Sequence, residues 1–104
     1  MIRNPKRKTK RTGRPRPPVT QDTVAPVIGE VLREYREDKN VSQEALAHIA
    51  DVDRTFVSQV ELGKRQPTLT TFFKLADGLE SPPSQIMSVI EQRFEARTRG
   101  GEPS

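Results

Sequence analysis

A chain of 104 residues with no cysteine and one histidine allows one domain at most and excludes a disulfide framework, and we expect neither a metal site nor a cofactor. No apolar run is long enough to span a membrane, and none follows the basic N-terminal residues, so we expect a soluble, cytoplasmic protein without a secretory signal. The net charge of +4 is unevenly distributed, since residues 1–18 hold eight basic groups and no acid, whereas the remainder holds ten basic and fourteen acidic groups.

Residues 1–22 are rich in arginine, lysine and proline and lack hydrophobic periodicity, so we expect a disordered basic arm. Within it, residues 11–16 resemble the core of an AT-hook, although that motif usually has a basic residue where Thr12 stands. Such a segment can place arginine in a narrow A·T-rich minor groove, and the candidates are Arg11, Arg14 and Arg16. The alternative, which we favour, is an arm that contacts phosphates without sequence preference.

The first amphipathic helix is predicted to begin between Val24 and Val27 and to end near Lys39. Pro26 is acceptable in a first turn, and Asn40 suits the helix end because asparagine tolerates the left-handed conformation. The residues that we expect to face the core are Ile28, Val31, Leu32 and Tyr35.

Residues 41–63 predict two short helices joined by a tight turn. Ser42 is a suitable N-cap for the first helix, and the second begins at about Arg54 and ends before Gly63. Neither helix is long enough to be stable alone, so both must pack on their neighbours. Their apolar faces are expected to contain Leu46, Ala47, Ile49 and Ala50, and then Phe56, Val57 and Val60.

Thr68 is expected to cap a helix from about Leu69 to Leu79, and another helix follows from about Pro83 to Arg97. The first of these should bury Leu69, Phe72, Leu75, Ala76 and Leu79. The last helix has more apolar side chains than one core-facing stripe needs, so part of it is a candidate two-fold interface, with Met87, Ile90 and Phe94 as its residues. The alternative is that all of them pack within one chain. Residues 98–104 should fray.

The outward positions of the helix that starts at Arg54 carry polar residues suited to reading DNA. Arginine and glutamine reach guanine and adenine edges in the major groove, and threonine can bond a base or contact the thymine methyl group. A helix face that is merely solvated usually holds more glutamate and lysine. The base-reading candidates are Arg54, Thr55, Ser58 and Gln59.

Several fixed spacings between residues 42 and 67 occur together in one known family of proteins. The chain resembles the phage repressor and Cro type of helix-turn-helix regulator (XRE-like) in the pieces Ser42-Gln43, Leu46-Ala47 and Ser58-Gln59-Val60-Glu61-x-Gly63-x-x-x-Pro67. The resemblance covers about residues 27–83. It implies an all-α, lambda-repressor-like bundle of five helices over residues 23–97 that binds double-stranded DNA.

The same resemblance implies roles for individual residues. Phosphate contacts are expected from Ser42, Gln43, Lys64 and Arg65. Arg36 and Glu61 are expected to pair and to tie the first helix to the end of the third. Asp51 departs from the family pattern, which usually has glycine in this turn, and aspartate can adopt the left-handed conformation there at some cost.

We therefore expect a small homodimeric transcriptional regulator that associates with the nucleoid and binds a near-palindromic operator, with repression as the default mechanism. The size and the lack of a sensor domain also suit a controller of a restriction-modification system, which activates as well as represses, or the antitoxin partner of a toxin. A function of a different class is also open: the protein could be an adaptor whose last helix binds another protein. The acidic net charge of the domain favours this alternative. No catalytic constellation is present, so we expect no enzyme.

Overall fold

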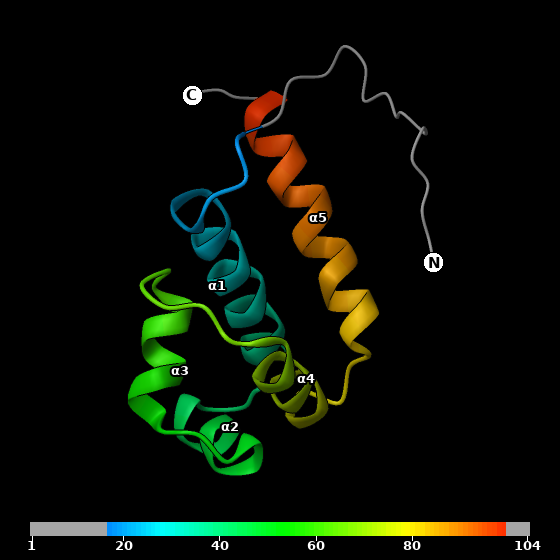
Figure 1. Ribbon diagram of the computed structural model, residues 1–104. Coiled ribbons are helices and arrows are strands. Elements are labelled where there is room, and N and C mark those ends of the chain that lie inside the picture. The colour runs from blue at the N-terminus through cyan, green and yellow to red at the C-terminus, as the bar shows by residue number, and fades with distance from the viewer. Residues whose placement is uncertain (1–16, 100–104) are drawn as a thin grey trace, which may run out of the picture.

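The computed structural model describes residues 17–99, and this part of the chain forms five α-helices and no strand. The helices are α1 (Gln21–Asp38), α2 (Gln43–Ala50), α3 (Arg54–Glu61), α4 (Leu69–Gly78) and α5 (Pro83–Arg99) (Figure 1). The expectation of an all-α, five-helix bundle is confirmed.

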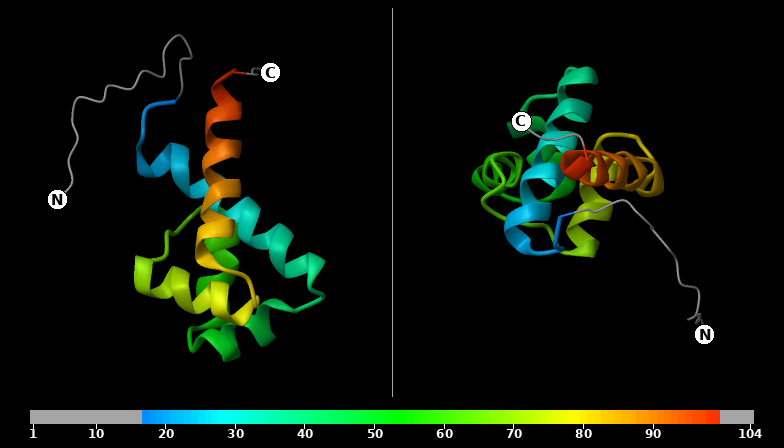
Figure 2. Two further views of the ribbon diagram at one scale, coloured as in Figure 1. Left: turned by 90° about the vertical axis from the view of Figure 1, so that its right-hand side faces the viewer. Right: turned by 90° about the horizontal axis from the view of Figure 1, so that it is seen from above.

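Helix α1 is central, because it packs on α3 along one side and on α5 along the other. Helix α2 packs on α3 and α4, and α4 packs on α5. Figure 2 shows α5 crossing α1 with the opposite chain direction, and the ion pairs agree, since Arg93 pairs with Glu34 while Arg97 pairs with Glu30. The α2–α3 pair therefore lies at the end of the molecule remote from the C-terminal end of α5 (Figure 1).

The core is a single apolar cluster to which all five helices contribute. Its largest fully buried side chains are Leu46, Leu75, Leu79, Ile86, Val27, Val31 and Val60. Ile28 and Tyr35 pack against this cluster as partly buried residues. The prediction that Ile49 and Leu69 are buried in the core is wrong, because both side chains are more than half exposed. Ile49 lies off the stripe formed by the buried residues of α2, and Leu69 occupies the first position of α4, one turn before buried packing begins at Phe72.

The N-terminal end of α1 differs from the prediction. The helix begins at Gln21, inside the segment expected to form the arm, because Thr20 caps it and exchanges hydrogen bonds with Thr23 in a capping box. Pro26 therefore lies inside the helix rather than in its first turn, where it removes one backbone hydrogen bond. Thr23 Oγ1 also donates to the carbonyl oxygen of Pro18 at 2.6 Å, which fixes the chain just before the helix.

Most of the other helix ends follow the predicted signals. Ser42 and Thr68 accept backbone N–H groups as N-caps, and Asn40 and Asp51 adopt the left-handed conformation with φ of 58° and 59°. Helix α5 continues to Arg99, two residues beyond the predicted end. The remaining predicted tail (100–104) and the arm residues 1–16 lie outside the described part of the chain.

Helix α1 and the end of α3 meet at their backbones. A Cβ atom on Gly29 would lie 2.1 Å from the carbonyl oxygen of Val60 and 2.8 Å from that of Glu61, so only glycine fits this crossing. One turn nearer the start of α1, a Cβ on Gly63 would lie 2.9 Å from the Cα of Pro26. Because these contacts involve main-chain atoms, they fix the position of α3 on α1 closely.

Candidate nucleic-acid interface

The turn between α2 and α3 is built from local signals. Ser42 Oγ accepts the N–H of Ala45 at 3.0 Å and starts α2. Asp51 then takes the left-handed conformation, and the N–H of Val52 returns to the carbonyl of Ala47 at 2.9 Å, which ends the helix. Aspartate thus fills the position for which the family pattern prefers glycine.

Helix α3 buries one face and exposes the other. Val57 and Val60 are buried against the core, whereas Arg54 and Thr55 are exposed and Ser58 and Gln59 are half-buried. All four predicted base-reading residues thus reach the surface, and the two at the N-terminal end of the helix are the most accessible. That end enters the major groove most deeply in helix-turn-helix proteins.

Behind this face, Arg36 and Glu61 form the predicted ion pair. Arg36 Nε lies 2.6 Å from Glu61 Oε2 and its Nη2 lies 3.0 Å from Oε1, while Nη1 donates to the carbonyl of Val41 at 2.8 Å. The Glu61 side chain is only 4% exposed. Hydrogen bonding to Glu61 raises the pKa of Arg36 above its ordinary value, so the guanidinium stays charged.

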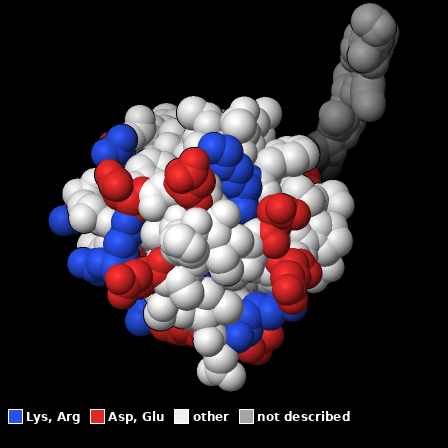
Figure 3. Space-filling model, turned by 90° about the horizontal axis from the view of Figure 1, so that it is seen from below, with Lys and Arg blue, Asp and Glu red and all other residues white. Residues whose placement is uncertain are grey.

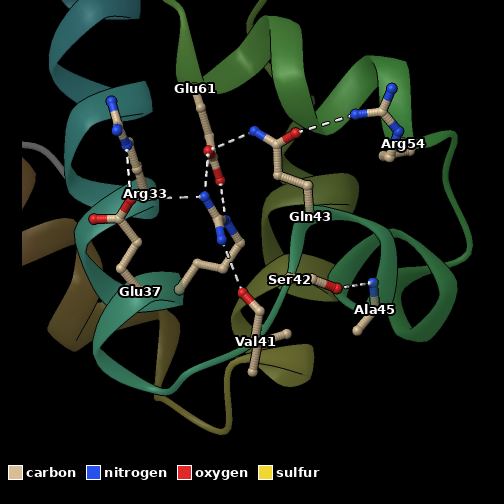
Figure 4. Close-up of polar contacts among 9 residues, drawn as sticks. Arg33, Glu37, Val41, Ser42, Gln43, Ala45, Arg54 and Glu61 are labelled. Carbon is tan, nitrogen blue, oxygen red and sulfur yellow. Dashed lines mark hydrogen bonds and ion pairs between the residues drawn. The ribbon is translucent and has the colours of Figure 1, made fainter.

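Gln43 extends this pair toward the surface, a contact that no pattern in the sequence indicates. Its Nε2 donates to Glu61 Oε1 at 2.9 Å, and its Oε1 accepts from Arg54 Nη1 at 3.3 Å. Figure 4 shows the Gln43 amide between Glu61 and Arg54. The three residues come from two helices and are spaced irregularly in sequence, so no periodic pattern could have joined them. The expected contact of Gln43 with a phosphate stays a prediction.

The loop after α3 holds Lys64 and Arg65. Lys64 is exposed, while the guanidinium of Arg65 lies 5.1 Å from the centroid of the Phe56 ring. Such a cation–π contact restrains an arginine near the surface without neutralising it. Both side chains remain available for the phosphate contacts that the resemblance implies.

The predicted interface on α5 is mostly wrong. Ile90 and Phe94 are 5% and 7% exposed, so they pack inside the chain. Their burial follows from the crossing of α5 over α1 and its contact with α4. Met87, which is 42% exposed, is the one predicted interface residue on the surface.

Charges on the described surface are mixed. Figure 3 views the end of the molecule at which α2 lies, and acidic and basic side chains alternate there without a continuous basic patch. Residues 17–99 also contain more acidic than basic groups. Attraction to DNA would therefore depend on individual cations and on the arm.

Among residues 17–99, no group of metal-binding side chains and no helix able to span a membrane occurs.

The comparison with known families decides the class of this fold. A model of the helix-turn-helix family matches residues 32–86, which is more than half of the chain and includes α2, α3 and the turn between them. The protein belongs to this XRE-type helix-turn-helix family. The family consists of DNA-binding transcriptional regulators and is not a class of enzymes, so the prediction of the fold and of the general function is confirmed.

Several relatives share most of this region. Control protein C.MunI of Mycoplasma sp is 38% identical over 66 residues, which are 62% of this chain and 89% of that protein. The restriction-modification controller protein C.AhdI from Aeromonas hydrophila has a solved structure with 39% identity and a TM-score of 0.58, covering 64% of this chain and 98% of that one. The clp gene regulator ClgR from Corynebacterium glutamicum, at 19% identity, shares the fold over 82% of this chain and 85% of its own, with a TM-score of 0.71.

Proposed function

We propose that the protein is a homodimeric transcriptional regulator that reads a near-palindromic operator with α3. The observation that carries this proposal is the polar outer face of α3, where Arg54 and Thr55 are exposed on a helix whose back is fixed to α1 and α2. Such a helix can enter the major groove without rearrangement. Two copies related by a two-fold axis would place their recognition helices about 34 Å apart, one turn of DNA.

Within this arrangement the residues divide by role. Arg54 would read guanine, and Gln59 would contact adenine or a phosphate, with Thr55 and Ser58 beside them. Phosphate contacts from Ser42, Gln43, Lys64 and Arg65 would hold the register, because such contacts position a protein without specifying sequence. Helix α2 begins at Gln43, so the positive end of its dipole favours a phosphate there.

A dimer is supported by apolar side chains that the single chain leaves uncovered. Leu69 and Phe73 are exposed one turn apart on α4, and Met87 is exposed on α5, which packs on α4. Exposed apolar groups on adjacent helices favour a self-complementary contact. The dimer would also double the DNA surface that one small reading helix can bury.

The relatives favour one of the regulatory alternatives. C.MunI is a control protein and C.AhdI is a restriction-modification controller protein, and the latter is matched over nearly its whole length. We therefore propose that this protein is a controller of the restriction-modification type, which activates as well as represses, and that it acts in the cytoplasm. Neither the antitoxin nor the adaptor alternative has a comparable observation in its favour.

The decisive experiment is selection of bound duplexes from a random-sequence library with the full chain at near-physiological salt. We expect a two-fold symmetric consensus whose half-site spacing follows from the dimer. Enrichment of A·T-rich DNA without symmetry would instead assign binding to the arm. No enrichment, together with capture of a stoichiometric protein from the source cell, would favour the antitoxin or adaptor alternative.

Deletion of residues 1–16 is expected to flatten the plot of log affinity against log salt while leaving the preferred operator unchanged. The deletion removes the eight basic groups of the arm but keeps Pro18, which accepts the hydrogen bond from Thr23. Each lost phosphate contact should reduce the slope by about 0.9. An unchanged slope would show that the arm does not contact phosphates.

An Arg14→Ala variant separates the two interpretations of the arm. If the arm acts only through phosphates, this variant should change the slope by about 0.9 at most and leave the flanking sequence preference as it was. If A·T preference beside the operator disappears, the AT-hook-like interpretation is supported.

A further inference from the structure

Glu61 contacts Gln43 as well as Arg36, and its hydrogen bond with Gln43 determines which way the Gln43 amide is turned. Oε1 of Glu61 receives hydrogen bonds from Gln43 Nε2 at 2.9 Å and from Arg36 Nη2 at 3.0 Å. An ionised carboxylate accepts hydrogen bonds and cannot donate them, so the amide must turn its NH₂ group toward Glu61. The orientation of the Gln43 amide is therefore set by a buried charge.

The other end of the same amide meets Arg54. Oε1 of Gln43 accepts from Arg54 Nη1 at 3.3 Å. If the amide were reversed, its NH₂ group would face the guanidinium, which has donors and no acceptor. Arg54 therefore has this partner only while Glu61 holds the amide in its present orientation.

We propose that Glu61 is a positioning residue that sets the base preference of Arg54 through the amide of Gln43. This inference rests on the proposed function, since it requires α3 to read bases. The side chain of Glu61, at the end of α3, is nearly fully buried against Arg36 of α1 and would touch no base. Its effect is to hold an exposed arginine near one position before DNA arrives, which reduces the side-chain entropy lost on binding.

Holding Arg54 in this way leaves its reading capacity intact. The guanidinium has five N–H groups, and the contact with Gln43 occupies one of them, so a bidentate contact with guanine is still available. The Gln43 amide also keeps one N–H beyond that used by Glu61, which can donate to a phosphate. One amide can thus join the buried carboxylate, the reading arginine and the DNA backbone.

The test compares three changes on operators that differ only at the base pair read by Arg54. Arg54→Ala identifies that base pair, as the position at which discrimination relaxes. Gln43→Met removes the amide but keeps the Arg36–Glu61 pair. The double variant R36M/E61M removes the carboxylate without leaving an unpaired buried charge. Proteins often tolerate the replacement of a whole buried ion pair by apolar residues of similar volume. Circular dichroism establishes that each variant is folded before binding is measured.

We expect Gln43→Met and the double variant each to lower the ratio of affinities for preferred and non-preferred base by about 3- to 10-fold, the effect of one hydrogen bond. In an Arg54→Ala background neither change should alter the ratio further. A residue that only clamps phosphate or stabilises the fold would weaken binding to all operators equally. Should the double variant not fold, Glu61→Asp, which withdraws the carboxylate by one methylene, is expected to act in the same direction.

Two results would overturn the inference while leaving the regulator function intact. One is a parent protein that selects a consensus but whose Arg54→Ala variant relaxes no base pair. The other is an unchanged affinity ratio in the folded Gln43→Met or Glu61 variants. A parent that selects no sequence would instead contradict the proposed function itself.

Discussion

Gly29→Ala is expected to lower the free energy of unfolding by about 3 kcal/mol and the melting temperature by roughly 10 to 20 °C. The added methyl group would lie 2.1 Å from the carbonyl oxygen of Val60 and 2.8 Å from that of Glu61. These are backbone atoms and cannot turn aside, so α1 and α3 must separate. Because the same crossing positions α3, operator affinity should also fall by at least about tenfold at temperatures where the variant is still folded.

Gly78→Ala is the matched control for this prediction. Gly78 also lies in a helix and is buried, but its added methyl group would meet side-chain carbons rather than backbone atoms, Leu46 Cδ1 at 2.9 Å and Ile49 Cγ2 at 3.2 Å. Alanine favours the helix by about 1 kcal/mol relative to glycine, which offsets the crowding. Thermal and urea unfolding of both variants should therefore separate them clearly. Equal stabilities would show that the α1–α3 crossing is not rigid.

Local signals in the sequence predicted the parts of the fold that local chemistry decides. The caps at Ser42 and Thr68, the left-handed residue Asp51 and the glycine after α3 each depend on a few neighbouring residues. The start of α1 differs from the prediction because Pro26, which suits a first turn, lies inside the helix. The capping box that begins the helix instead uses a second threonine, Thr23, in place of the usual glutamate or glutamine.

Features that depend on how helices cross could not be predicted in the same way. The burial of Ile90 and Phe94 is decided by the contacts of α5 with α1 and α4, which helical periodicity does not specify. At the candidate site, helical spacing predicts the exposed polar face of α3, and the family resemblance predicts the Arg36–Glu61 pair; the structure confirms both. The contact of Gln43 with that pair is not predicted, because it needs the start of α2 to lie beside the end of α3.

Arg36→Met should destabilise the protein by about 3 to 5 kcal/mol and weaken operator binding at the same time. The substitution leaves the Glu61 carboxylate buried with Gln43 as its remaining partner, and it removes the donor to the Val41 carbonyl. Since Glu61 ends α3 and Gln43 starts α2, loss of the pair loosens both helices of the DNA-binding motif. Chemical unfolding and operator titration of the same preparation measure the two effects.

Arg93→Met makes the same change in an exposed pair and should cost less than about 1 kcal/mol, because solvent screens the contact. Arg93 donates two hydrogen bonds to Glu34, at 2.7 and 2.8 Å, yet Glu34 is half exposed. The hydrogen bond from Arg93 lowers the pKa of Glu34, so this contribution is complete at neutral pH and is lost as the pH falls through that lowered value. The free energies of unfolding of the parent and of Arg93→Met should therefore converge in acid. At neutral pH, Arg36→Met should be much less stable than Arg93→Met. If Arg36→Met were no worse than Arg93→Met, the buried pair would not be what joins α1 to α3.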